Sequence, residues 1–183
     1  MSELDVLLDR YRTLLQLTWS PTLSGAERVW FVVYSPAQER RLRLRLADFE
    51  LATCAAGHGW VWIDVSDAFA DWMATHEYRD DYFREPEYVE TVLPEFFEVL
   101  TRRLQAQLAA ADANSVVAIF GLSALFGLAS ISDLVVAVRS AIRGRLLVFF
   151  PGKKEGSNYR FLDAKDGWNY LSIAITADEA ASP

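Results

Sequence analysis

Residues 29–34 read VWFVVY, a short run of β-branched and aromatic residues that carries no charge. A continuous apolar run of this length is typical of a strand that is buried on both faces of a parallel sheet. Ser35 and Pro36 follow directly and end the run. A helical pattern over residues 36–56 separates it from a second apolar run, WVWIDV, at residues 60–65. The order strand, helix, strand predicts a right-handed crossover with both strands parallel in one sheet.

Strand and helix patterns alternate through the rest of the chain. Residues 116–120 (VVAIF) and 145–150 (RLLVFF) predict two further strands. After a loop at residues 151–158, two strand-like runs, 159–162 and 170–176, are expected to form a hairpin. Helices are expected at the amphipathic N-terminus, after a cap at Ser66 or Asp67, in a long segment ending near residue 111, and from a capping box of Ser130 with Asp133 to Gly144.

These elements predict a single α/β domain over residues 1–176, followed by a disordered tail at residues 177–183. The expected fold has three layers, with a mostly parallel sheet flanked by helices, either Rossmann-like or like a degenerate P-loop domain, and a C-terminal strand pair. A length of 183 residues and a hydrophobic content of 52% allow one substantial core.

Composition restricts the expected location and partners. The net charge of −7 argues against a direct nucleic-acid footprint, so nucleic acid is expected to be reached only indirectly. The one cysteine, Cys54, cannot form an internal disulfide, which favours the cytoplasm. The N-terminus lacks the pattern of a secretory signal, and glycines and serines interrupt the uncharged residues 114–132. No membrane association is expected.

A crevice for a ligand or partner is expected at the carboxyl ends of the strands, where open α/β sheets bind their ligands. The candidate residues are Ser35, Pro36, Asp64, Gly121, Ser123, Pro151, Gly152 and Lys153.

The two glycine-containing loops at this edge lack the residues of a working phosphate loop. Residues 121–127 (GLSALFG) contain no lysine, and residues 151–157 (PGKKEGS) precede no apolar helix. Leu125 stands where a nucleophile elbow around Ser123 needs its second glycine, so no catalytic residue is assigned. The alternative is an α/β protein that binds or hydrolyses a nucleotide with a degenerate loop.

Metal and cofactor sites are not expected either. The two histidines and one cysteine have no zinc-site spacing. Asp64 with Asp67 and Asp71 is the best carboxylate cluster, but helix-dipole stabilisation explains the last two better than magnesium does.

A surface for a protein partner is predicted in residues 77–88, EYRDDYFREPEY. Aromatic residues mixed with both signs of charge have the composition of protein interfaces. A loop packed over the core would have a similar composition, and this alternative stays open. The candidate contact residues are Tyr78, Tyr82, Phe83 and Tyr88.

Four segments resemble the BrxB family of BREX phage-defence systems: VVYSPAQERRLRLRL (32–46), IFGLSALFG (119–127), LLVFFPG (146–152) and LDAKDGWNYLSI (162–173). The family motif falls on Tyr34, Pro36 and Glu39, on Gly121, and on Phe150, Pro151 and Gly152. The chain resembles a short, variant member. The resemblance implies a non-catalytic component that works beside a PglZ-type protein of the alkaline phosphatase superfamily, a methyltransferase and a large ATPase.

Overall fold

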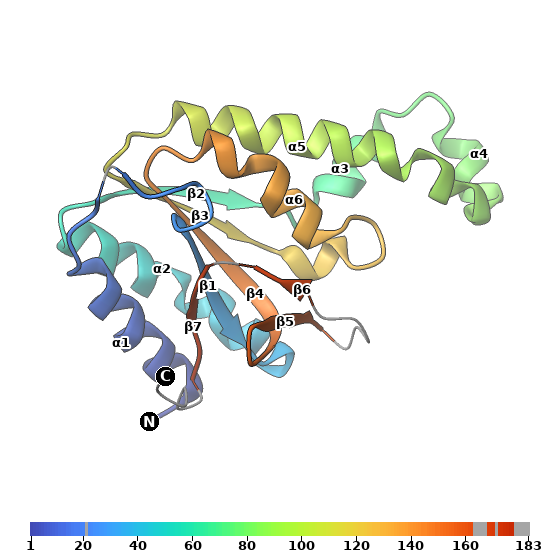
Figure 1. Cartoon of the computed structure of the whole chain (residues 1–183). Helices are drawn as coiled ribbons and strands as arrows, with labels where there is room; N and C mark the ends of the chain where they lie inside the picture. Colours follow the sequence, from blue (N-terminus) through green and yellow to red (C-terminus); the bar gives the residue numbers. More distant parts are fainter. Residues whose placement is uncertain (21, 163–167, 171, 178–183) are drawn as a thin grey trace.

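The computed structural model describes residues 1–20, 22–162, 168–170 and 172–177. Five parallel strands form the main sheet in the order β2-β3-β4-β1-β7 (Figure 1). Their bounds are β1 Val29–Tyr34, β2 Gly59–Asp64, β3 Ser115–Phe120, β4 Arg145–Glu155 and β7 Ile173–Ile175. The shorter strands β5, Asn158–Phe161, and β6, Trp168–Asn169, continue the sheet in antiparallel pairing from the end of β4.

Helices cover both faces of the sheet, which confirms the three-layer α/β fold. On one face lie α1, Glu3–Leu15, and α2, Glu39–Ala55. On the other lie α3, Ala68–Ala74, α5, Leu93–Ala110, and α6, Ile131–Val138. The short helix α4, Arg79–Arg84, lies near the N-terminal end of α5 and away from the sheet (Figure 1).

The run VWFVVY is buried at every position because β1 is an inner strand between β4 and β7. Side chains alternate between the faces of a strand. Phe31 and Val33 join the core under α5 and α6, whereas Trp30 and Val32 join the core under α1 and α2. The two apolar cores therefore meet at the strand that the sequence marks as buried on both faces.

The predicted parallel arrangement of the first two strands is confirmed, although they are not neighbours. From β1 the chain passes under the sheet through α2 to the opposite edge, where β2 lies. The strands β3 and β4 then return step by step, so that β4 pairs with β1. All of these strands point the same way, and their carboxyl ends lie along one edge.

The prediction for the last fifth of the chain was wrong in two places. The expected loop at residues 151–158 is largely strand, because β4 continues to Glu155 and turns at Gly156 into β5. The final run pairs in parallel with β1 through Ile173–Ile175 and not with the preceding run. The C-terminal strand pair is formed by β5 and β6. The expected tail is described only at Ala177, and its other residues lie outside the described part.

The two helix starts that were predicted from capping residues have different outcomes. Asp67 takes the cap position of α3, but neither its side chain nor that of Ser66 caps the helix. Ser130 does cap α6 by accepting a hydrogen bond from the Asp133 amide at 3.3 Å. The regular part of that helix ends at Val138, so it does not extend to Gly144.

Candidate functional site

The carboxyl edge of the sheet holds most of the predicted crevice residues. Tyr34 at the end of β1 lies opposite Pro151 of β4, and β2 ends beside β3. Ser35 follows β1, Asp64 ends β2, and Gly121 follows β3. The parallel register alone therefore brings residues from four strands to one edge.

A chain of polar contacts joins the ends of β1 and β2 across the first turns of α2. The Tyr34 hydroxyl donates a hydrogen bond to the Glu39 carboxylate. Arg43 Nη2 lies 3.9 Å from Glu39 Oε1, and Arg43 Nη1 lies 3.8 Å from Asp64 Oδ2. Arg43 Nη2 also donates to Ser66 Oγ at 3.3 Å. We call these five residues the edge network.

The edge network holds its charged groups in place and leaves the tyrosine as a donor. Burial raises the pKa of the Tyr34 phenol above its ordinary value of 10.0, and the Glu39 carboxylate raises it further. The Arg43 guanidinium lies 4.6 Å from the centroid of the Phe120 ring. Since the Arg43 side chain is 51% exposed, its ion pairs add little to stability and mainly fix its position.

Gly121 lies directly against this network. Its φ of +88° is in the left-handed region, and a Cβ built on it would lie 2.3 Å from Ser66 Oγ and 2.6 Å from Asp64 Oδ1. The Ser66 amide donates to the same Asp64 oxygen at 2.9 Å. Asp64 therefore accepts a hydrogen bond within a tight turn, and the glycine at position 121 is required for the close approach of β3 to that turn.

Aromatic side chains fill the carboxyl edge on the face of the sheet that α5 and α6 cover. Tyr159 of β5 lies with its ring centroid 4.8 Å from that of Phe31, and Phe161 lies 5.5 Å from Phe150. Gly152 permits this packing, because a Cβ there would lie 2.1 Å from the Arg160 carbonyl oxygen. The space beside β4 that a crevice would use on this face thus belongs to the core.

Two predicted crevice residues lie apart from the edge network. Ser123 is in the 3-10 helix Leu122–Leu125, and Lys153 is exposed on the part of β4 that pairs with β5. Within the described residues, neither side chain forms a hydrogen bond or ion pair with the network. The structure does not assemble Ser123, Asp64 and Lys153 into one site.

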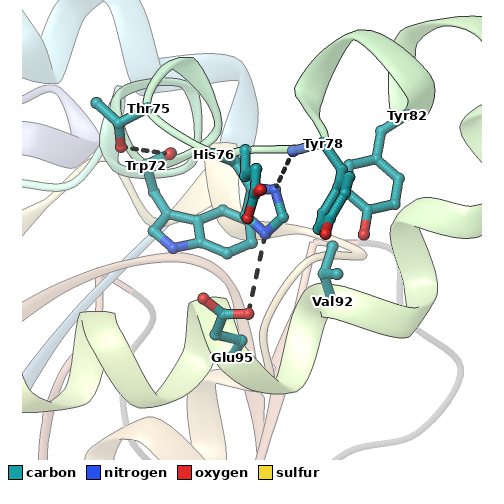
Figure 2. Close-up of a pocket in the computed structure, with 8 residues that line it drawn as sticks. Trp72, Thr75, His76, Tyr78, Tyr82, Val92 and Glu95 are labelled. Atoms are coloured by element: carbon teal, nitrogen blue, oxygen red, sulfur yellow. Dashed lines mark hydrogen bonds and ion pairs between the residues drawn. The ribbon is translucent and has the colours of Figure 1, made fainter.

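A pocket of about 530 Å³ lies where α3, α4 and the start of α5 meet (Figure 2). We call it the lobe pocket. It is lined by Trp72, Thr75, His76, Glu77, Tyr78, Tyr82, Val92 and Glu95.

His76 lies among the aromatic rings of the lobe pocket. Its ring centroid is 5.0 Å from that of Trp72 and 5.4 Å from that of Tyr82. Its Nδ1 accepts a hydrogen bond from the Tyr78 amide at 3.2 Å. Its Nε2 faces Glu95 Oε2 at 3.9 Å (Figure 2). With 11% of its side chain exposed, His76 forms part of the floor of the pocket.

The negative charge of the chain is concentrated around this pocket. Residues 71–98, which we call the acidic lobe, contain nine acidic and two basic residues, whereas the rest of the chain contains sixteen of each. Arg79 pairs with Asp80 and Arg84 pairs with Asp81, so both basic residues of the lobe are engaged. The net charge of −7 is therefore the charge of the lobe alone.

The four predicted surface residues all lie in the acidic lobe, in two groups. Phe83 and Tyr88 are 70% and 53% exposed on the outside of the lobe, whereas Tyr78 and Tyr82 line the pocket. Residues 79–92 form α4 and the 3-10 helix Pro86–Val92, and neither contains a buried residue. The alternative of a loop packed over the core does not describe this segment.

Five residues of the lobe pocket lie outside the predicted surface segment: Trp72, Thr75, His76, Val92 and Glu95. Trp72 is in α3, and His76 follows two residues after that helix ends at Ala74, so no helical spacing joins the two in the sequence. Glu95 comes from a different helix, after the whole of α4, and only the packing of α3 near the start of α5 brings it to His76.

Comparison of the chain with protein-family models, with curated proteins and with solved structures found no match. Among the helices of the described residues, none combines the length and the apolar character that crossing a bilayer requires. In the same part of the chain, no three His, Cys, Asp or Glu side chains are grouped closely enough to hold a metal ion.

Proposed function

We propose that this chain is a cytoplasmic, non-catalytic assembly module of a BREX-type anti-phage defence complex. It binds a PglZ-type protein through the acidic lobe and works with the methyltransferase and ATPase of the same system, through which it reaches DNA indirectly. The identity of the system is taken from the sequence resemblance to the BrxB family. The mode of action is argued from the lobe.

The observation that carries the proposal is the exposure of large aromatic side chains on a strongly charged projection. Phe83 and Tyr88 are 70% and 53% exposed, and neither lines the lobe pocket. Aromatic residues are enriched among those that dominate protein binding energy, and surrounding charges steer a partner of opposite sign. A solvent-facing Phe in an acidic segment has no role in the core and is available to a partner.

The scaffold under the lobe supports this role. Helix α5 packs on the sheet through a regular stripe of fully buried residues at Phe96, Leu100, Leu104 and Leu108. Its N-terminal turn contributes Glu95 to the lobe pocket. The lobe is thus attached to a long helix that the core holds in place, and a partner that contacts it meets a surface with little ordering cost.

The test is co-purification of this chain with a PglZ-type protein. We expect the double variant Phe83→Ala, Tyr88→Ala to lose most of the recovered partner, because two exposed anchors are removed at once. The matched control is Leu44→Ala, Leu51→Ala, which removes two side chains that are 86% and 67% exposed on α2, on the opposite face of the sheet.

Both double variants are expected to unfold in urea within about 0.5 kcal/mol of the wild-type chain, since exposed residues are replaced. Equal loss of partner in both variants would assign the effect to general surface hydrophobicity and reject a specific role for the lobe. No recovery of any defence-system protein by the wild-type chain would reject the proposed function itself.

A further inference from the structure

We infer that the lobe pocket binds one positively charged side chain, lysine or arginine, of the partner protein. This inference rests on the proposed function and names the chemistry of the contact. Phe83 and Tyr88 lie outside the pocket, so the two groups of residues can be tested separately.

The walls of the pocket suit a cation. Trp72, Tyr78 and Tyr82 line it together with His76, whose ring lies within 5.0 to 6.2 Å of all three by centroid distance. The faces of aromatic rings carry partial negative charge and attract ammonium and guanidinium groups.

The charges of the pocket have one sign. Glu77 and Glu95 are among its lining residues, and none of the eight is lysine or arginine. The nearby Arg79 does not compensate them, because its Nε pairs with Asp80 at 3.2 Å and its Nη1 donates to the Ala74 carbonyl at 2.8 Å. An entering cation therefore gains a carboxylate partner without displacing an existing ion pair of Glu77 within the described residues.

The depth of the pocket fits a side chain inserted from outside. The His76 side chain at the floor is 11% exposed, whereas Glu95 is 59% exposed. A lysine or arginine side chain that enters the pocket would contact aromatic carbon along its aliphatic part and a lining carboxylate, Glu77 or Glu95, at its charged end. An apolar side chain fits less well, because it would remove water from two carboxylates without pairing them, and an anion would meet the field of the acidic lobe.

Small cations test the inference without any partner protein. The chain has six tryptophans, and the indole N–H signal of Trp72 in a proton–nitrogen NMR spectrum is assigned by its loss in Trp72→Phe. We expect methylguanidinium and n-butylammonium to shift this signal saturably, with a Kd on the order of millimolar for so small a ligand. Methylurea and n-butanol, which have similar shapes and no charge, are expected to leave it in place.

Matched variants separate the pocket from the general charge of the lobe. Glu95→Gln and Tyr78→Ala are expected to weaken cation binding roughly tenfold, the factor that corresponds to about 1.4 kcal/mol for a partly desolvated cation contact. Glu98→Gln removes the same charge one turn further along α5, and Tyr88→Ala removes a tyrosine of similar exposure, 53% against 54%. Neither control residue lines the pocket, so both are expected to bind the cations as the wild type does.

The outcomes distinguish this inference from the proposed function. Tighter binding of methylguanidinium assigns the natural side chain as arginine, and tighter binding of n-butylammonium assigns it as lysine. Equal shifts with the neutral analogues, or equal effects of Glu95→Gln and Glu98→Gln, overturn the inference even if the Phe83 and Tyr88 variant still loses its partner. Cation binding by a chain that recovers no defence-system protein supports the pocket and rejects the proposed function.

Discussion

Replacing Gly121 by alanine tests the close packing between the end of β3 and the turn after β2. The added Cβ would lie 2.3 Å from Ser66 Oγ, 2.6 Å from Asp64 Oδ1 and 2.7 Å from the Ser66 amide nitrogen. One of these atoms belongs to the backbone, so a side-chain rotation cannot relieve the whole overlap. The turn that holds Asp64 and Ser66 has to move.

Two terms set the expected loss of stability. The φ of +88° costs a residue with a Cβ roughly 1–2 kcal/mol. Forcing atoms apart in a well-packed region costs about 1–3 kcal/mol more. We therefore expect the free energy of unfolding to fall by about 2–5 kcal/mol, measured by urea titration with an unchanged m value.

Gly127→Ala is the matched control. Gly127 also has a positive φ, +75°, but a Cβ there meets nothing within 4 Å. Gly127→Ala therefore has only the cost of the positive φ, and its free energy of unfolding is expected to fall by about 1–2 kcal/mol. The difference between the two variants measures the contact with the edge network.

A second substitution tests whether Ser66 Oγ is the atom that the added Cβ overlaps. Ser66→Ala removes the nearest overlapping atom, so the double variant Gly121→Ala, Ser66→Ala is expected to recover part of the lost stability. The reasoning is refuted if Gly121→Ala is no less stable than Gly127→Ala, because the approach of β3 to the Asp64 turn would then be loose.

Two further predictions concern acid stability and nucleotides. Hydrogen bonds from Ser2, and then from Arg45, hold the pKa of Asp5 below its ordinary value of 3.8, so the stability that this carboxylate contributes is present above that pH and is lost as pH falls below it. We expect the wild type to have a higher urea midpoint than Asp5→Asn at about pH 5, and this difference to become smaller as the pH is lowered to about 2. A difference that stays constant over this range would contradict the assignment. ATP or GTP with magnesium is expected to leave the melting temperature unchanged, because Glu39 and Asp64 place carboxylates at the strand ends. A nucleotide that binds the folded chain and is present at a hundred times its Kd would add about 2.7 kcal/mol to the free energy of unfolding. The melting temperature would then rise by several degrees, and this result would favour the nucleotide-binding alternative.

Local patterns in the sequence were sufficient for the elements of the main sheet and most of its helices. The run at residues 29–34 corresponds to β1 residue for residue, because an uncharged β-branched stretch can satisfy burial only as an inner strand. The helical spacing of residues 4–15 likewise corresponds to α1, with Leu7 and Tyr11 fully buried. The position of Gly121 after β3 was predictable, but its reason was not, since Ser66 and Asp64 come from a different strand end.

Tertiary structure decided the rest, because the deciding contacts join residues distant in sequence. GKKE, residues 152–155, has no strand pattern of its own and becomes part of β4 through pairing with β5. Ile173–Ile175 could have paired with any exposed strand edge and lies parallel to β1 because that edge is left free by the order of the other strands. The lobe pocket has the same origin: composition marked Tyr78 and Tyr82 as surface aromatics, but Glu95 reaches His76 only through the packing of one helix near another. Periodicity reports which face of an element is buried, and it contains no information on which distant element covers that face.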